Sequence, residues 1–250
     1  MRRICIALHV VCLLSYSLGA AGSLSDDYGF LSEHAPFVQF IDAVIGQGNP
    51  EKGELLRQQL LSTPLLPKEK QAVLVIRSST LLARLYSELE RPDIQRAKEL
   101  LSEAEKSLNV LSDTPFFHLM SEAEIDSIHY LINPSRLVKG ISSNSKIKKA
   151  YTQYPSQVYA ILMKANSLLY APSFAGGDKE EALSLLLFLL EEGGSQLSNW
   201  DLASIYVGIG RICMERTEWD NALGYFTAAK ALYAFDPTLD GYIRETEEQL

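Results

Sequence analysis

The sequence predicts an all-α protein built as a solenoid, in which antiparallel helical hairpins stack in one continuous unit. Apolar residues recur three or four positions apart along most of the chain, and no window shows sustained alternation of apolar and polar residues. Helix-capping residues, first-turn prolines and short connections punctuate this pattern. Because short connections force consecutive helices to run antiparallel, they favour stacked hairpins.

Composition excludes a fibrous or disordered chain and disfavours two kinds of partner. The 250 residues are 47% hydrophobic and 22% charged, as in ordinary globular proteins. Asp and Glu number 31 against 23 Lys and Arg, which gives a net charge of -8. No Lys/Arg-rich block interrupts this acidic balance, so nucleic acid and anionic membrane surfaces are disfavoured.

Residues 1–22 have the order of a cleaved signal peptide. Arg2 and Arg3 precede an apolar stretch that ends in small residues. That stretch is shorter than the ~20 residues needed to span a membrane. We therefore predict a periplasmic or secreted protein whose mature chain, residues 23–250, carries no transmembrane segment.

The positions of the cysteines disfavour a lipid anchor, an intramolecular disulfide and a cysteine nucleophile. Valines rather than small residues precede Cys12, which disfavours lipid attachment there. Cleavage would leave Cys213 as the only cysteine, so no intramolecular disulfide would be available. Cys213 lies in a helical apolar pattern, which predicts a small buried hydrophobe rather than a nucleophile.

The first half of the mature chain contains several predicted helices, over residues 49–62, 68–89 and 93–111. Asn49 and Pro50 provide a cap and a first-turn proline for the first of them. Ser121 and Glu124 have the spacing of a capping box, which predicts a helix from residue 121 to 133. Residues 139–149 contain glycine, several serines and an asparagine, which predicts an exposed connection.

The second half shows clearer hairpins. Helices are predicted over residues 155–170, from a cap at Asp178, over residues 199–215 and 218–232, and over residues 238–249. Residues 171–177 form a small-residue loop between the first two of these helices. We describe residues 23–150 as the degenerate part of the stack and residues 151–250 as its clearer part.

One segment resembles a tetratricopeptide repeat. Tyr206-x2-Ile209-Gly210-x2-Cys213 is followed by Ala222-x3-Phe226-x2-Ala229 and by Pro237. Over residues 203–237 this spacing is similar to the repeat pattern, with Cys213 where an aromatic residue is usual. We expect Gly210 and Ala222 to let two helices approach closely while Phe226 fills the groove beside them. The resemblance implies a right-handed superhelical stack whose first helices line a concave face.

A second resemblance covers residues 155–240. Gly176-Gly177-Asp178 followed by Ala182 looks like the loop and helix start of the periplasmic T component of TRAP-type transporters. That resemblance implies an accessory protein of solute transport, with a periplasmic solute-binding protein as its partner.

The predicted binding site lies on the first helices of the last two hairpins. Lys164 and Asn166 are polar residues embedded among apolar ones, and Arg211 follows Gly210. We expect Lys164 and Arg211 to form a positive spot for an anionic ligand or a partner carboxylate, with Tyr170 or Tyr206 as its wall. A structural role for Asn166 is the alternative.

No catalytic residue, metal ligand or cofactor site is predicted, and the function expected is non-enzymatic binding of a protein, peptide or small ligand. Two alternatives stay open. Asp126 and His129, three positions apart on one helix, would be the core of a metal-dependent enzyme site. Residues 183–190 are apolar except for Ser184, which predicts burial within the stack or else the interface of a homo-oligomer, as in a self-assembling envelope protein.

Overall fold

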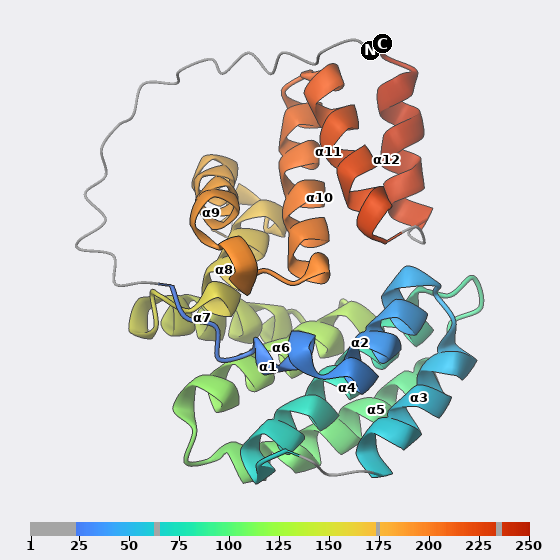
Figure 1. The fold of residues 1–250 in the computed structure, drawn as a ribbon, viewed down its shortest axis with the longest axis vertical. Coiled ribbons are helices and arrows are strands. Elements are labelled where there is room, and N and C mark those ends of the chain that lie inside the picture. The colour runs from blue at the N-terminus through green and yellow to red at the C-terminus, as the bar shows by residue number, and fades with distance from the viewer. Residues whose placement is uncertain (1–23, 63–65, 174–175, 234–236) are drawn as a thin grey trace.

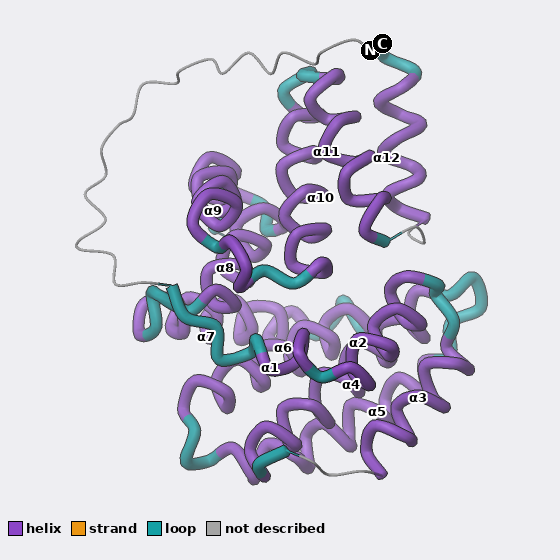
Figure 2. The backbone as a smooth tube through the Cα atoms, viewed as in Figure 1, coloured by secondary structure: helices purple, strands orange, loops and turns teal. Residues whose placement is uncertain are grey.

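The computed structural model describes residues 24–62, 66–173, 176–233 and 237–250, which form twelve α-helices (Figure 1). Short loops join the helices, and the described residues contain no strand (Figure 2). The prediction of an all-α protein is confirmed. The predicted signal peptide lies outside the described residues.

The N-terminal half comprises the described residues from 24 to 153. Its helices are α1 (Phe30–Glu33), α2 (Ala35–Ile41), α3 (Pro50–Ser62), α4 (Lys68–Glu88), α5 (Ile94–Ser107), α6 (Pro115–Ile132) and α7 (Leu137–Gln153). A π-helical turn at Asp42–Gly46 follows α2, and a 3-10 turn at Leu108–Leu111 follows α5. The predicted cap of α3 is confirmed, because the Asn49 side-chain oxygen accepts a hydrogen bond from the Lys52 amide at 2.9 Å.

The C-terminal half comprises the described residues from 154 to 250. Its helices are α8 (Val158–Tyr170), α9 (Lys179–Glu192), α10 (Asn199–Glu215), α11 (Trp219–Leu232) and α12 (Pro237–Glu247). The predicted cap of α9 is present, since the Asp178 carboxylate accepts hydrogen bonds from the amides of Glu180 and Glu181. A capping box of Ser198 and Asp201 begins α10.

Neighbouring helices pack in pairs along the chain. The pairs α4/α5, α6/α7, α8/α9 and α10/α11 make the most extensive contacts. Across the pairs, α4 contacts α6, and α10 contacts both α8 and α12. Figure 1 shows α8 at the junction of the two halves, where it contacts α7, α9 and α10.

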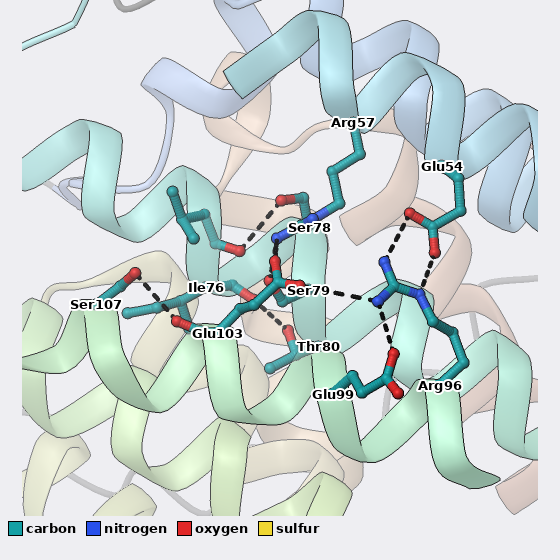
Figure 3. Close-up of polar contacts among 11 residues, drawn as sticks. Glu54, Arg57, Ile76, Ser78, Ser79, Thr80, Arg96, Glu99, Glu103 and Ser107 are labelled. Carbon is teal, nitrogen blue, oxygen red and sulfur yellow. Dashed lines mark hydrogen bonds and ion pairs between the residues drawn. The ribbon is translucent and has the colours of Figure 1, made fainter. Parts of the chain in front are cut away.

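Arginines tie α3 to the next two helices (Figure 3). The buried Arg57 donates hydrogen bonds to Ser79 of α4 and Glu103 of α5, both at 2.7 Å. Arg96 of α5 binds both carboxylate oxygens of Glu54 on α3, at 2.6 and 3.1 Å. A bidentate ion pair fixes the orientation of the two side chains as well as their distance, so it sets the register of α3 against α5.

The helix predicted to begin at a capping box begins earlier, so that prediction is wrong. Thr114 occupies the N-cap position of α6 and Pro115 its first turn, while Ser121 is buried inside the helix. The Glu124 carboxylate accepts hydrogen bonds from Arg77 and Thr80 of α4 instead of capping a helix end. The motif is local, whereas the partner that decides the role of Glu124 lies on another helix.

The exposed connection predicted at residues 139–149 is also wrong, because these residues lie within α7. Their serines bond the neighbouring helix: Ser142 donates to the Asp126 carboxylate and the buried Ser143 donates to the Ala123 carbonyl, both at 2.7 Å. A hydroxyl that finds a partner across a helix interface no longer favours a turn.

The close approach predicted in the last hairpin is confirmed. A Cβ atom placed on Gly210 would lie 2.6 Å from the Phe226 ring. Phe226 and Ala222 are fully buried, and Cys213 is buried as predicted. Only glycine therefore lets α10 approach α11 this closely without displacing the ring.

Most of the apolar stretch at residues 183–190 packs against the core, because Leu183, Leu185, Phe188 and Leu190 are partly buried there. Leu186 and Leu189 are fully buried, but Leu187 is 38% exposed. The predicted burial of this helix is therefore confirmed in part, since Ser184 and Leu187 are the exposed residues of the stretch. The prediction of an oligomer interface there stays a prediction.

None of the helices that the structure describes is both long enough and apolar enough to cross a membrane.

Candidate functional site

A cavity of about 390 Å³ lies where the two halves meet. Residues of α1, α2 and α4 line it from the N-terminal half, and residues of α8 and α10 line it from the C-terminal half. Its volume lies within the ~300 to 1,000 Å³ of small-molecule sites. The cavity is therefore large enough to hold a small-molecule ligand.

The segment before α1 closes one side of the cavity. The Ser25 amide donates to the Ser156 carbonyl, and the Ser25 carbonyl accepts from the Val158 amide, both at 2.9 Å. The Gln196 side chain donates to the Leu24 carbonyl at 3.0 Å. These bonds hold the segment across the start of α8 and the loop before α10, so this part of the cavity wall is tied to the C-terminal half.

A buried ion pair borders the cavity. Arg77 of α4 donates to the Glu124 carboxylate of α6 at 2.7 Å and to the Tyr159 hydroxyl of α8 at 2.6 Å. Burial lowers the pKa of Arg77, but the adjacent Glu124 carboxylate more than offsets this effect and the net pKa lies above its usual value. Arg77 is therefore charged, and Glu124 balances that charge.

Aromatic rings enclose the Arg77 guanidinium. Its central carbon lies 5.0 Å from the centre of the Tyr159 ring and 4.7 Å from that of Trp200, at the start of α10. Tyr28 stacks on Tyr159 with ring centres 4.3 Å apart. Cation–π contacts of this kind hold the cation and the rings in one rigid assembly.

The remaining charged groups that line the cavity are carboxylates: Asp26, Asp42 and Asp201. Burial raises the pKa of Asp26 to about 6, and the negative charge of Asp201 adds to this shift. Burial likewise raises the pKa of Tyr233 to about 12, with Asp42 and Asp201 contributing. Because Glu124 already balances Arg77, the cavity carries net negative charge.

The predicted site residues on α8 are partly occupied by structural contacts. Lys164 lies 3.8 Å from the Glu181 carboxylate of α9. Asn166 donates to the Ser204 hydroxyl of α10 at 3.4 Å, which favours the structural role considered for it. No contact joins Lys164 to Arg211 within the described part of the chain.

The structure brings Arg211 and Tyr170 together. The Arg211 guanidinium lies 4.6 Å from the centre of the Tyr170 ring and 5.5 Å from that of Tyr242 on α12. Tyr206 instead packs against Tyr225, with ring centres 6.2 Å apart. Arg211 forms no ion pair with any residue that the structure describes.

Asp126 and His129 have separate partners. Asp126 accepts from Lys139 and Lys146, both at 2.6 Å, and His129 pairs with Glu105 at 2.8 Å. Within the described ranges, no group of three or more His, Cys, Asp or Glu side chains is arranged to hold a metal ion. Burial raises the pKa of Cys213 to about 11, which makes its thiol a poor nucleophile at neutral pH.

None of the binding residues predicted from the sequence lines this cavity. One signal was present, because Arg77 is a charged residue between Ile76 and Leu81 in the apolar stripe of α4. A long charged side chain on the buried face of a helix requires a partner. Comparisons with known protein families, with curated proteins and with solved structures found no match.

Proposed function

We propose that this chain is an exported, non-enzymatic scaffold with a tetratricopeptide-like, right-handed solenoid fold, which binds a ligand on the inner face of its first helices. The helix pairs α4/α5, α6/α7, α8/α9 and α10/α11 support the solenoid, as does the Gly210–Phe226 contact. The observation that carries the proposal is the cavity, because α4, α8 and α10 are first helices of their pairs and all contribute to it.

The lining of the cavity favours a ligand with a cationic group. Asp26, Asp42 and Asp201 supply unbalanced negative charge, and Trp200 supplies an aromatic surface. Carboxylates together with aromatic faces are the groups that bind ammonium and guanidinium ions. An anionic ligand would meet repulsion from all three carboxylates.

Titration calorimetry with agmatine, a small molecule that carries both an amine and a guanidinium, tests this function. We expect agmatine to bind and glutarate, an anion of similar length, not to bind. The double variant Asp26→Asn and Asp42→Asn should bind agmatine at least about tenfold more weakly, because each lost charged contact is worth ~1.5 kcal/mol or more.

The matched control is Asp220→Asn, which removes one carboxylate from the exposed surface of α11. Its affinity for agmatine should equal that of the wild type. Glutarate binding as tightly as agmatine, or unchanged agmatine affinity in the folded double variant, would overturn the proposal.

A second binding surface is favoured by Arg211. Its guanidinium lies over the Tyr170 ring and has no carboxylate partner among the described residues, which supports capture of a partner carboxylate. Arg211→Ala together with Lys164→Ala should remove the partner that the wild-type chain captures from a periplasmic extract. The control Arg84→Ala with Lys98→Ala, on exposed surfaces of α4 and α5, should keep it.

The narrower role, an accessory component of a periplasmic solute-transport system, rests on the Gly176-Gly177-Asp178 loop and on the proposed export. Gly176 adopts a φ of 90°, and a Cβ atom on Gly177 would lie 1.9 Å from the Ala171 carbonyl oxygen, so this loop requires both glycines. The same capture experiment tests the role, because it predicts a solute-binding protein as the partner. Capture of an unrelated protein would contradict it.

A further inference from the structure

The α6–α7 hairpin carries a group of exposed apolar side chains that the proposed ligand cavity does not use. Leu137, Val138 and Ile141 of α7 are 61%, 77% and 69% exposed. Tyr130 and Leu131 at the end of α6 are exposed as well. Clusters of exposed large apolar residues on soluble domains usually mark interaction sites.

These side chains lie at the same end of the α6–α7 hairpin, beside the turn that joins the two helices. A Cβ atom on Gly140 would lie 3.2 Å from the Tyr130 ring, so this ring lies against α7. Leu137 and Ile141 are separated by one helical turn and flank Gly140 on the same helix. We call Tyr130, Leu131, Leu137, Val138 and Ile141 the hairpin patch.

Charge around the hairpin patch is positive, in contrast to the rest of the chain. No acidic residue occurs between Asp126 and Asp178, although the whole chain has a net charge of -8. Two lysines of α7, Lys139 and Lys146, are paired with Asp126. The exposed side chains of the remaining basic residues of this hairpin form no ion pair with described residues: Arg136, Lys148 and Lys149.

We propose that the hairpin patch and these three cations bind an anionic lipid bilayer, with α7 lying at the interface. Aliphatic side chains that project this far do not require a matching pocket, because the acyl region of a bilayer accepts them directly. Lysines on the same helix place their ammonium groups at the headgroups while their stems contact apolar atoms. Whole-chain charge disfavours such a surface, but membrane attraction depends on the local charge within about 10 Å.

Vesicle flotation tests the proposal. The purified full chain should float with phosphatidylcholine vesicles that contain phosphatidylglycerol, and not with phosphatidylcholine alone. Added salt should weaken binding, because screening reduces attraction between the lysines and the headgroups. All variants carry the same residues 1–23, so any contribution of that segment is common to them.

Two sets of variants separate charge from apolar insertion. Lys148→Glu with Lys149→Glu should lower the partition coefficient at least about tenfold, since each basic residue near an anionic surface contributes roughly fivefold. Leu137→Ser, Val138→Ser and Ile141→Ser together should lower it by a similar factor. Lys98→Glu with Lys106→Glu, the same charge change on exposed positions of α5, is the matched control and should bind like the wild type.

A fluorescent probe reports insertion directly. Val138→Trp should show a blue shift of its emission with anionic vesicles, larger than any shift of the wild type, because the indole would enter an apolar environment. Equal flotation with neutral and anionic vesicles, no flotation at all, or equal loss in the control and patch variants would each overturn the proposal. These results are independent of agmatine binding in the cavity.

Discussion

Helices pack against one another through different kinds of residue in the two halves of the molecule. Buried polar and charged side chains concentrate in the N-terminal half: Arg57, Arg77, Ser78, Ser79, Thr80, Ser121, Glu124, Asp126 and Ser143. In the C-terminal half, Gln157 and Thr246 are the buried polar residues among those described. There, small residues such as Gly210 and Ala222 let helices approach closely, and the ion pairs of Arg216 and Lys179 lie at the surface.

This difference explains why sequence patterns predict the helix contacts of the C-terminal half better than those of the N-terminal half. Contact between small and large residues follows helical spacing, and a repeat motif records it. A buried polar network depends on partners that are distant in sequence, such as Arg77 and Glu124, which are 47 positions apart. Buried directional bonds are therefore concentrated in the N-terminal half, whereas packing in the C-terminal half depends more on steric fit.

The largest effect should come from breaking the buried ion pair. Glu124→Leu would leave the Arg77 charge without its partner in a buried site, which costs about 3–5 kcal/mol. Arg77→Met combined with Glu124→Leu should recover most of this loss, because no buried charge remains. Urea denaturation measures both variants. A wild-type midpoint for Glu124→Leu alone would show that the network does not stabilise the N-terminal half.

Overpacking the close helix contact should have the next largest effect. Gly210→Ala places a methyl group where the Phe226 ring lies, so we expect a loss of about 1–3 kcal/mol. Gly224→Ala, on α11 with nothing within 4 Å of the added methyl group, should stabilise the protein by about 0.5–1 kcal/mol. Thermal unfolding of the two variants should shift in opposite directions. If both substitutions shifted the unfolding temperature in the same direction, close steric fit at Gly210 would not be what stabilises the C-terminal half.

The junction of the halves should respond to pH through Asp26. Its pKa is raised from 3.8 to about 6, so the folded chain holds this proton more tightly than the unfolded chain does. The free energy of unfolding contributed by Asp26 therefore falls as pH rises from about 4 to about 6 and stays low above that range.

Asp26→Asn keeps an oxygen that accepts from the Tyr28 amide and removes this titration. The variant should be more stable than the wild type at pH 7.5 and equal to it below pH ~4. Urea titrations across this pH range measure the difference. Parallel stability curves for the two proteins would rule out Asp26 as the titrating group.

The smallest effect should come from a surface ion pair of the C-terminal half. Arg216, the C-cap of α10, binds the Glu180 carboxylate of α9, but Glu180 is largely exposed and Arg216 is partly exposed. Arg216→Ala should cost about 0–1 kcal/mol, and high salt should abolish the difference because it screens the pair. A loss as large as that of Glu124→Leu would show that burial does not separate the two classes of ion pair.

The sequence by itself determined the helical class, most helix limits, the caps at Asn49 and Asp178, and the close contact of Gly210 with Phe226. These features depend on residues within a few positions of one another or on one helical period, so a linear pattern records them. It also indicated that Arg211 and Tyr170 belong together, although it paired Lys164 with them.

Only the tertiary structure decided the start of α6, the helical state of α7 and the ligand cavity. Glu124 and Ser143 have local patterns typical of caps and turns, but inside their helices they form hydrogen bonds with partners on α4 and α6. The cavity brings together Asp26, Arg77 and Asp201 from three separate segments. The cost of burying a polar group depends on the partner it meets, and that partner is known only when the chain has folded.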